Sequence, residues 1–258
     1  DRGEPPGMTN RDGGVVGGRG TQTSNGHASL HSGGGSCGAN SLAPCDDTEH
    51  GTHTMGAMVG DDGGANQIGM APGARWIGCR NMDQGAGTPA TYTECFEWFI
   101  APTNLAGANP DPEKAPHVIN NSWSCPVSEG CTDPLVLQTV VENTRAAGIE
   151  VVVSAGNSGS SCSTVDTPAA IYGASFSVGA TDNSDNIAGF SSRCPVTIDC
   201  SDRLKPDISA PGVCVRSRFP CNGYASLSGT SMSCPHIAVP AAPPLSACPG
   251  ISLHTHPS

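Results

Sequence analysis

The sequence lacks the long apolar run of a membrane-spanning segment. No stretch of its 258 residues approaches the 18 or more consecutive apolar residues that a transmembrane helix needs. No charged segment followed by an apolar one opens the chain, so we expect any secreted form to be a processed one. Basic residues are scarce, with 12 Lys and Arg against 23 Asp and Glu and a net charge of −11. This charge argues against nucleic acid and anionic membranes as partners, because both repel a negative surface.

The cysteines also lack the spacing of a zinc site. None of the 13 Cys residues is arranged in the paired C-x-x-C units that zinc sites use. So many cysteines are unusual for a cytosolic enzyme, and they favour disulfides in an oxidising, secreted environment. Cys37 with Cys45 and Cys125 with Cys131 are each separated by a short loop, which predicts two local disulfides. The other pairings are left open, and an odd number leaves at least one thiol unpaired within the chain.

Glycine and proline indicate a folded chain that is rich in loops. The 34 Gly and 22 Pro residues make up about a fifth of the sequence, just below the range of about 25–30% that suggests low-complexity disorder. The length suits one α/β domain, so we treat residues 1–258 as a single domain. Residues 1–36 contain no alternating run that would define a strand, and residues 1–30 are taken as an irregular N-terminal segment.

Hydrophobic periodicity predicts alternating strands and helices. Helices are expected at 50–60, 89–100 and 133–148, and strands at 75–80, 117–122 and 149–157. Thr88 as N-cap and Pro89 in the first turn support the helix at 89–100, whose apolar residues recur at helical spacing.

This strand–helix–strand order predicts a parallel sheet that is covered by helices. Ligands of such sheets bind beyond the carboxyl ends of the strands. Asn121, Ser122 and Asn157 lie at the carboxyl ends of two of the predicted strands, so a site is expected there.

Two familiar site patterns do not fit. His50 and His53 are three residues apart with Gly and Thr between them, whereas the zinc-protease motif needs His at i and i+4 with a Glu. The nucleophile elbow G-x-S-x-G of an α/β-hydrolase is also missing, because "GTSMS" around Ser231 lacks the second Gly. His50 also precedes Ser231, the reverse of the hydrolase order.

The segments "HGTHTMG", "VVVSAGNSG" and "GTSMSCPH", in that order, resemble the signature segments of the subtilisin-like serine proteases, the subtilases. Longer stretches, including "VINNSW" and "RLKPDISAPGV", are similar to the bacterial bacillopeptidase F branch. The resemblance implies a three-layer subtilisin-like α/β fold with a mainly parallel sheet. It further implies a secreted serine endopeptidase that is a monomer and acts on proteins or peptides, with proteinaceous protease inhibitors as further partners.

The resemblance assigns roles to particular residues. Ser231 is implied to be the nucleophile, His50 the general base, and Asn157 a side-chain donor to the oxyanion. A serine hydroxyl needs such a base, since it is a weak nucleophile at neutral pH. Two further segments are implied to bind the extended substrate backbone and wall the specificity pocket, namely Asn121, Ser122, Trp123 and Ser124 together with Ser154, Ala155 and Gly156.

The acidic residue that would hold His50 is the least determined. The family places this Asp in an Asp-Thr-Gly or Asp-Ser-Gly turn, and no such tripeptide occurs in the chain. Asp1 has the nearest register, with Asp12 as the alternative; the third hypothesis is that no acidic partner is present. Asp46 and Asp47 lie too close to His50 along the chain and match family residues that border the substrate groove.

Several positions depart from the family pattern. Glu150 falls in a strand expected to be buried, where an unpaired carboxylate is costly. Proline should also end the helix after Ser231 within a few turns, which makes 237–258 an atypical tail. Residues that stand where the branch is expected to have Gly or Asn are Ser124, Cys194, Cys200, Cys214, Cys221 and Cys234; the cysteines among them are candidate disulfide partners.

These departures keep open a second hypothesis, an inactive or truncated subtilase-fold protein that binds peptides or inhibitors. No cofactor is expected for catalysis. Structural calcium is implied by the resemblance alone, because no loop of oxygen ligands can be assembled from the sequence.

Overall fold

The computed structural model describes residues 14–15, 26–28, 46–72, 74–104, 106–220 and 223–247. In this part of the chain the main sheet has seven strands in the order β2-β3-β1-β4-β5-β6-β7. Its parallel part joins β4 (Val118–Asn121), β5 (Glu150–Ser154), β6 (Phe176–Thr181) and β7 (Ile208–Pro211). The strands β8 (Val215–Phe219) and β9 (Gly223–Leu227) form a separate antiparallel hairpin.

The remaining strands lie at the other end of the sheet. β3 (Gly78–Arg80) pairs in parallel with β2 (Gly26–Ala28), and β1 (Gly14–Val15) lies antiparallel between β3 and β4. Sequence analysis placed no strand in residues 1–36, and β1 and β2 correct that expectation. Both strands have at most three residues, so they carry no periodic signal and depend on the strands they pair with.

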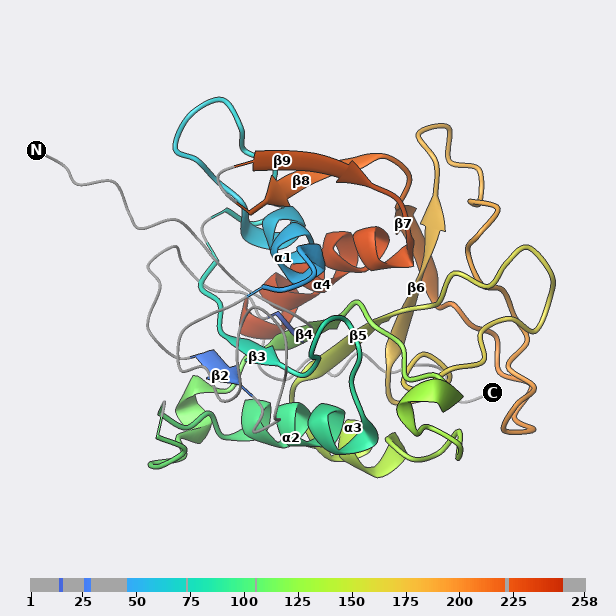
Figure 1. Cartoon of the computed structure of the whole chain (residues 1–258), viewed down its shortest axis with the longest axis horizontal. Coiled ribbons are helices and arrows are strands. Elements are labelled where there is room, and N and C mark those ends of the chain that lie inside the picture. The colour runs from blue at the N-terminus through green and yellow to red at the C-terminus, as the bar shows by residue number, and fades with distance from the viewer. Residues whose placement is uncertain are drawn as a thin grey trace, which may run out of the picture.

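Helices cover both faces of the sheet, which confirms the predicted three-layer fold (Figure 1). Helices α1 (His50–Val59) and α4 (Thr230–Ala247) lie on one face, and α2 (Pro89–Ile100) and α3 (Gln138–Ala146) lie on the other. Short 3₁₀ turns at Pro112–Lys114 and Val127–Glu129 complete the elements.

Alternation along the central strands produces two cores. Ile119 of β4 packs with side chains of α2 and α3, whereas its neighbour Val118 packs with side chains of α1 and α4. Val151 and Val153 of β5 face the α2–α3 side, and Val152 faces the other side. Successive side chains of a strand point to opposite faces, so a strand that is apolar throughout fits between two helical layers.

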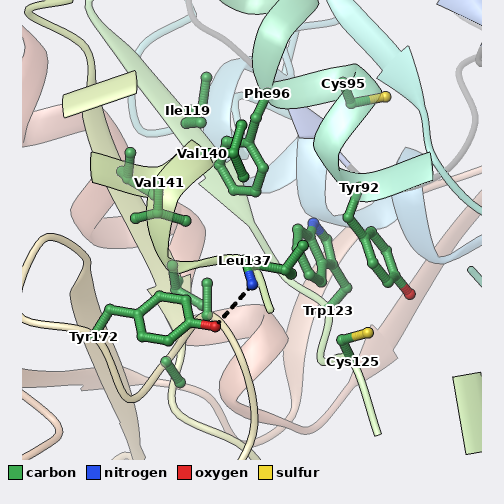
Figure 2. Close-up of a cluster of buried hydrophobic side chains, with 14 of the residues drawn as sticks. Tyr92, Cys95, Phe96, Ile119, Trp123, Cys125, Leu137, Val140, Val141 and Tyr172 are labelled. Atoms are coloured by element: carbon green, nitrogen blue, oxygen red, sulfur yellow. Dashed lines mark hydrogen bonds between the residues drawn. The ribbon is translucent and has the colours of Figure 1, made fainter. Parts of the chain in front are cut away.

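The core on the α2–α3 side is rich in aromatic side chains (Figure 2). Trp123 stacks on Tyr92 with ring centroids 4.0 Å apart, and Phe96 meets Trp123 edge-on at 6.0 Å. The phenol of Tyr172 accepts a hydrogen bond from the backbone N–H of Leu137 at 3.2 Å. These contacts join α2 and the start of α3 to the loop that follows β4.

Two disulfides reinforce the same side. The predicted bridge between Cys125 and Cys131 is confirmed, and a second one joins Cys79 of β3 to Cys95 of α2. Sequence analysis left this second pairing open, because the packing of the helix against the strand selects the partner. The expected bridge between Cys37 and Cys45 lies outside the described residues.

The helix at 89–100 has the predicted cap. Thr88 accepts a hydrogen bond from the N–H of Thr91, and Thr91 Oγ1 accepts one from the N–H of Thr88. This reciprocal pair satisfies two backbone donors that the first turn leaves open. The helix expected at 133–148 is shorter, since α3 begins only at Gln138.

Two other expectations change in the folded chain. Glu150 is paired after all, because Arg145 donates a hydrogen bond to its carboxylate at 2.9 Å; burial nonetheless raises the pKa of Glu150, and Arg145 opposes that rise. The helix after Ser231 continues past its prolines to Ala247, so the expectation that they would end it was wrong. Ala238 and Val239 of α4 lie in the core, and tertiary packing outweighs local helix preference there.

Candidate active site

The candidate nucleophile lies in the first turn of α4. Ser231 is half-buried, and its hydroxyl donates a hydrogen bond to the carbonyl oxygen of Ser122 at 3.3 Å. In return, the hydroxyl of Ser122 donates to the carbonyl oxygen of Ser231 at 2.9 Å. The chain segment that leaves β4 is therefore attached to the turn that carries Ser231. The first N–H groups of a helix have no acceptor within the helix, so this turn also offers backbone donors to an anion.

Asn157 is held against the same turn by its side-chain oxygen. Oδ1 accepts hydrogen bonds from the backbone N–H of Thr230 at 2.9 Å and from the Thr230 hydroxyl at 3.0 Å. Thr230 Oγ1 in turn accepts from the N–H of Gly156 at 3.2 Å. With the oxygen engaged, the amide nitrogen of the exposed Asn157 is the group left to donate. The structure thus joins Asn157 to the residue that precedes Ser231; that Asn157 and Ser231 donate to one oxyanion stays a prediction.

Ser154, Ala155 and Gly156 lead from the end of β5 to Asn157. Ser154 and Ala155 are buried, and Gly156 has φ +103°, a value that side chains rarely tolerate. A Cβ atom on Gly156 would also lie 2.9 Å from the hydroxyl oxygen of Ser192. The backbone N–H of Ser192 donates to the carbonyl oxygen of Gly156 at 3.0 Å. Ser192, which sequence analysis did not select, therefore supports the turn before Asn157 from behind.

His50 is the first residue of α1 and is partly buried. Burial lowers the pKa of its imidazole, and the nearby Asp46 carboxylate acts in the opposite direction and raises it. A lowered pKa keeps the ring neutral at pH 7, as a group that accepts a proton must be. Among the described residues, His50 forms no hydrogen bond with Ser231, whose hydroxyl is directed to Ser122 instead. The two helices that carry them pack against each other.

Asp46 fixes the start of the helix that carries His50. Its carboxylate accepts hydrogen bonds from the backbone N–H of Glu49 at 2.6 Å and of Thr52 at 2.9 Å, and from the Thr52 hydroxyl. Glu49 occupies the N-cap position itself, but it has φ +65° and no capping hydrogen bond. Asp46 therefore takes over the capping role, and its negative charge suits the positive end of the helix dipole.

His53 has a structural partner and does not form a metal pair with His50. Its Nε2 lies 3.1 Å from the carbonyl oxygen of Val215 and 3.2 Å from that of Ala225, so the ring donates to the β8–β9 hairpin. Burial lowers the pKa of His53, while these two backbone contacts raise it. In the described ranges, no group of three or more His, Cys, Asp and Glu side chains lies together as a metal site would need. We therefore assign no calcium site there.

The expected pocket residues after β4 divide into two groups. Asn121 and Trp123 have inward side chains: the amide of Asn121 donates to Val152 O at 3.2 Å, and the Trp123 ring packs on Tyr92. Ser122 contacts the Ser231 turn, as described above, and Ser124 is half-buried. The side chains of Asn121 and Trp123 are thus engaged in the interior, and the expected pairing of a substrate with this segment's backbone stays a prediction.

Sequence analysis named two candidates for the acidic partner of His50. Asp1 and the alternative Asp12 both lie outside the described residues. Of the residues that sequence analysis did not select, Thr230 had the clearest signal, since it directly precedes Ser231 in the "GTSMS" segment. Asp46 was expected only at the border of the substrate groove; its signal as a cap was an Asp shortly before the first residues of the helix, where it accepts from Glu49 and Thr52. Ser192 had no local signal, because it approaches Gly156 only through the fold.

A mainly parallel sheet between two helical layers, with Ser231, Asn157 and His50 grouped on one side of it, can be compared with known protein families. Residues 35–256 match the family model described as the Subtilase family. The chain belongs to this family.

Individual relatives agree with this assignment. Bacillopeptidase F of Bacillus subtilis (strain 168) is 42% identical over 210 residues, which are 79% of this chain but 14% of the relative. Subtilisin DY of Bacillus licheniformis is 35% identical over 80% of this chain and 67% of its own length. Subtilisin E of Bacillus subtilis (strain 168) is 34% identical over 76% of this chain and 45% of its own. The chain thus spans a small part of the first relative and about half to two thirds of the others.

Solved structures show the same fold at lower identity. A cold adapted subtilisin-like serine proteinase has a TM-score of 0.62 at 23% identity, covering 90% of this chain and 73% of its own. The prenylagaramide maturation protease PagA has a TM-score of 0.61 at 21% identity, covering 77% of this chain and 64% of its own. No helix in the described residues is both long and apolar enough to cross a membrane.

Proposed function

We propose that the chain is the peptidase domain of a secreted serine endopeptidase, which cleaves proteins or peptides through an acyl-enzyme on Ser231. The observation that carries this proposal is the junction of Asn157 with Thr230 and Ser231. At this junction the Asn157 amide and the Ser231 hydroxyl both lie at the N-terminus of α4, and this arrangement supports their proposed roles as oxyanion donor and nucleophile. We take residues 1–258 as a single peptidase domain and propose that it acts as a monomer.

The chemistry follows from the groups at this junction. Ser231 Oγ attacks the carbonyl carbon of the scissile peptide bond, while the neutral His50 ring takes the hydroxyl proton. The oxygen that becomes negative accepts hydrogen bonds from Asn157 Nδ2 and the Ser231 backbone N–H. His50 then passes the proton to the amine that leaves. A water molecule, deprotonated by the same ring, hydrolyses the acyl ester and restores Ser231.

One motion must precede the first step. The Ser231 hydroxyl now donates to Ser122 O at 3.3 Å, a long hydrogen bond for a hydroxyl donor. Rotation about the side-chain bond of Ser231 releases it, which costs little because the bond is weak. We propose that an acidic residue orients His50, with Asp1 as first choice and Asp12 as second. The labelling test below applies whichever of these residues orients His50.

The test is labelling with a serine-directed fluorophosphonate, followed by peptide mapping by mass spectrometry. We expect one modified residue, Ser231, and loss of hydrolysis of an unfolded protein in proportion to labelling. Ser226→Ala, at an exposed serine of β9, is the matched control and should label normally, whereas Ser231→Ala should not label. Absence of labelling in correctly folded protein would instead favour the inactive relative that only binds peptides.

A further inference from the structure

Two loop segments near Asn157 hold each other in place. The segment 156–165, which follows β5, runs beside the segment 190–194. Backbone N–H groups of Gly159, Ser163 and Thr164 donate to carbonyl oxygens of the second segment at 2.9–3.1 Å. Neither segment contains a helix or a strand in the structure. The loop that contains Asn157 is therefore held in place by its hydrogen bonds to the segment 190–194.

A cysteine lies on each side of the pairing. The N–H of Ser163, the residue after Cys162, donates to the carbonyl oxygen of Cys194 at 3.1 Å. Standard bond lengths then place the Cα atoms of Cys162 and Cys194 roughly 5–7 Å apart, and disulfides span about 4.4–6.8 Å. Cys162 is exposed and Cys194 is half-exposed, both as free thiols, so a small oxidant reaches them.

Of the other free cysteines of the described residues, Cys200 and Cys234 are less suitable partners for Cys194. An isolated β-bridge between Val196 and Arg203 closes the loop that contains Cys200. Cys194 lies outside this loop, before Val196. Cys234 is fully buried under the Ser231 turn, and burial raises its pKa to about 12. A thiol of that kind does not form the reactive thiolate.

We propose that Cys162 and Cys194 form a disulfide in the secreted protein and that this bond fixes the loop behind Asn157. The two thiols lose two protons and two electrons. A low-molecular-weight disulfide such as oxidised glutathione takes them up and is released as two thiols. The bond would replace a loop contact held by single hydrogen bonds with a covalent link. Its formation is independent of the proposed peptidase activity, and only its effect on turnover rests on that function.

The first experiment maps the bond directly. Full-length Ser231→Ala protein, which cannot digest itself, is incubated with oxidised glutathione, alkylated without reduction, digested and analysed by mass spectrometry. We expect a peptide pair that joins Cys162 to Cys194 and separates on reduction. Alkylation of both residues, or a bond from Cys194 to Cys200, would overturn the proposal. Because no turnover is measured, a failed peptidase hypothesis does not affect this result.

The second experiment measures what the bond does. After oxidation, Cys162→Ser and Cys194→Ser should each lower the melting temperature by roughly 5–10 °C. The double variant should lie no lower than either single one, because either change removes the same bond. Cys200→Ser, at another exposed cysteine, is the matched control and should leave the melting temperature unchanged. Additive losses from the two single variants would contradict a shared bond.

A turnover measurement separates a positioning effect from simple stability. At a temperature where all variants are folded, breaking the bond should lower kcat about two- to tenfold and leave KM nearly unchanged, since the loop behind Asn157 acts on the oxyanion. Reduced wild-type protein is not a suitable comparison, because reduction also opens the bridges at Cys79 and Cys125. If kcat stays the same while the map shows the bond, the link is structural only and its proposed effect on the loop is wrong.

Discussion

The two faces of the central sheet are built from different side chains. The face under α2 and α3 holds the large rings of Tyr92, Phe96 and Trp123 and both disulfides of the described residues. The buried apolar residues between the sheet and α1 and α4 are instead methionine, valine, alanine and cysteine. The candidate site lies on this second side, at the first turns of α1 and α4.

Small side chains allow the close approach that the site needs. A Cβ atom on Gly56 of α1 would lie 2.5 Å from the Ser217 hydroxyl oxygen and 2.7 Å from Cβ of Arg218. Any larger residue there would push α1, and His50 with it, away from the β8–β9 hairpin. The comparison teaches that the aromatic face contributes most of the buried apolar surface, whereas the other face positions the site. Substitutions at five positions can test this division.

Removal of the nucleophile should have the largest effect and touch only one side of the comparison. We expect Ser231→Ala to lower kcat by about 10⁶-fold, the size of loss that removing an activated serine causes. Its melting temperature should stay within about 2 °C of wild type, because the small half-exposed hydroxyl adds little burial. Peptide hydrolysis and thermal unfolding check the two values. Substantial remaining hydrolysis would show that another residue is the nucleophile.

A ring removed from the other side should show the opposite pattern. Phe96→Ala, made in the Ser231→Ala background to prevent self-digestion, should lower the free energy of unfolding by about 3–5 kcal/mol. Met58→Ala, on the α1 side and also fully buried, should cost less within its range of about 2–5 kcal/mol. Denaturant titration measures both. Equal losses of unfolding free energy would mean that the two faces contribute equally to stability, and this result would contradict the comparison.

The amide donor should affect chemistry and leave folding intact. Asn157→Ala should lower kcat by about 10²–10³-fold at nearly constant KM, the cost of one oxyanion donor. Asn157→Asp keeps an oxygen for Thr230 but replaces the donor with a second acceptor, so it should be at least as slow. Initial rates over a range of peptide concentrations separate kcat from KM. A fast Asp variant would show that Asn157 only holds Thr230.

The smallest effect is expected at the helix cap, where stability and site chemistry meet. Asp46→Asn should lower the free energy of unfolding by about 1 kcal/mol, because the amide keeps one acceptor oxygen and loses the second, so either Glu49 or Thr52 loses its acceptor. The Asp46 carboxylate raises the pKa of His50, so its removal lowers that pKa further. His50 then stays neutral to lower pH, and the acid limb of the pH profile of kcat/KM should move to lower pH. Glu97→Gln, at an exposed carboxylate of α2, should move neither; a shift to higher pH for Asp46→Asn would contradict the assignment.

Elements with strong local signals were predicted closely. The cap at Thr88 and the apolar stripe that follows it are properties of neighbouring residues, and the helix forms at 89–100 as expected. The strands around Ile119 and Val152 were also located, since an apolar run bounded by polar residues marks a buried strand. Pairing between distant segments was not predicted, as the bridge from Cys79 to Cys95 shows.

The sequence by itself determined the order of the main helices and strands, which follows from local periodicity. The three layers, and the joint site of Ser231, Asn157 and His50, were implied by the resemblance of short motifs to the family; the layers are confirmed and the site stays a prediction. Tertiary structure alone decided that Thr230 binds Asn157 Oδ1, that Arg145 compensates Glu150, and that Ser192 supports Gly156. Each of these contacts joins groups whose distance is set by the packing of other elements. No pattern within a single segment encodes such a distance, because it depends on how all the layers fit together.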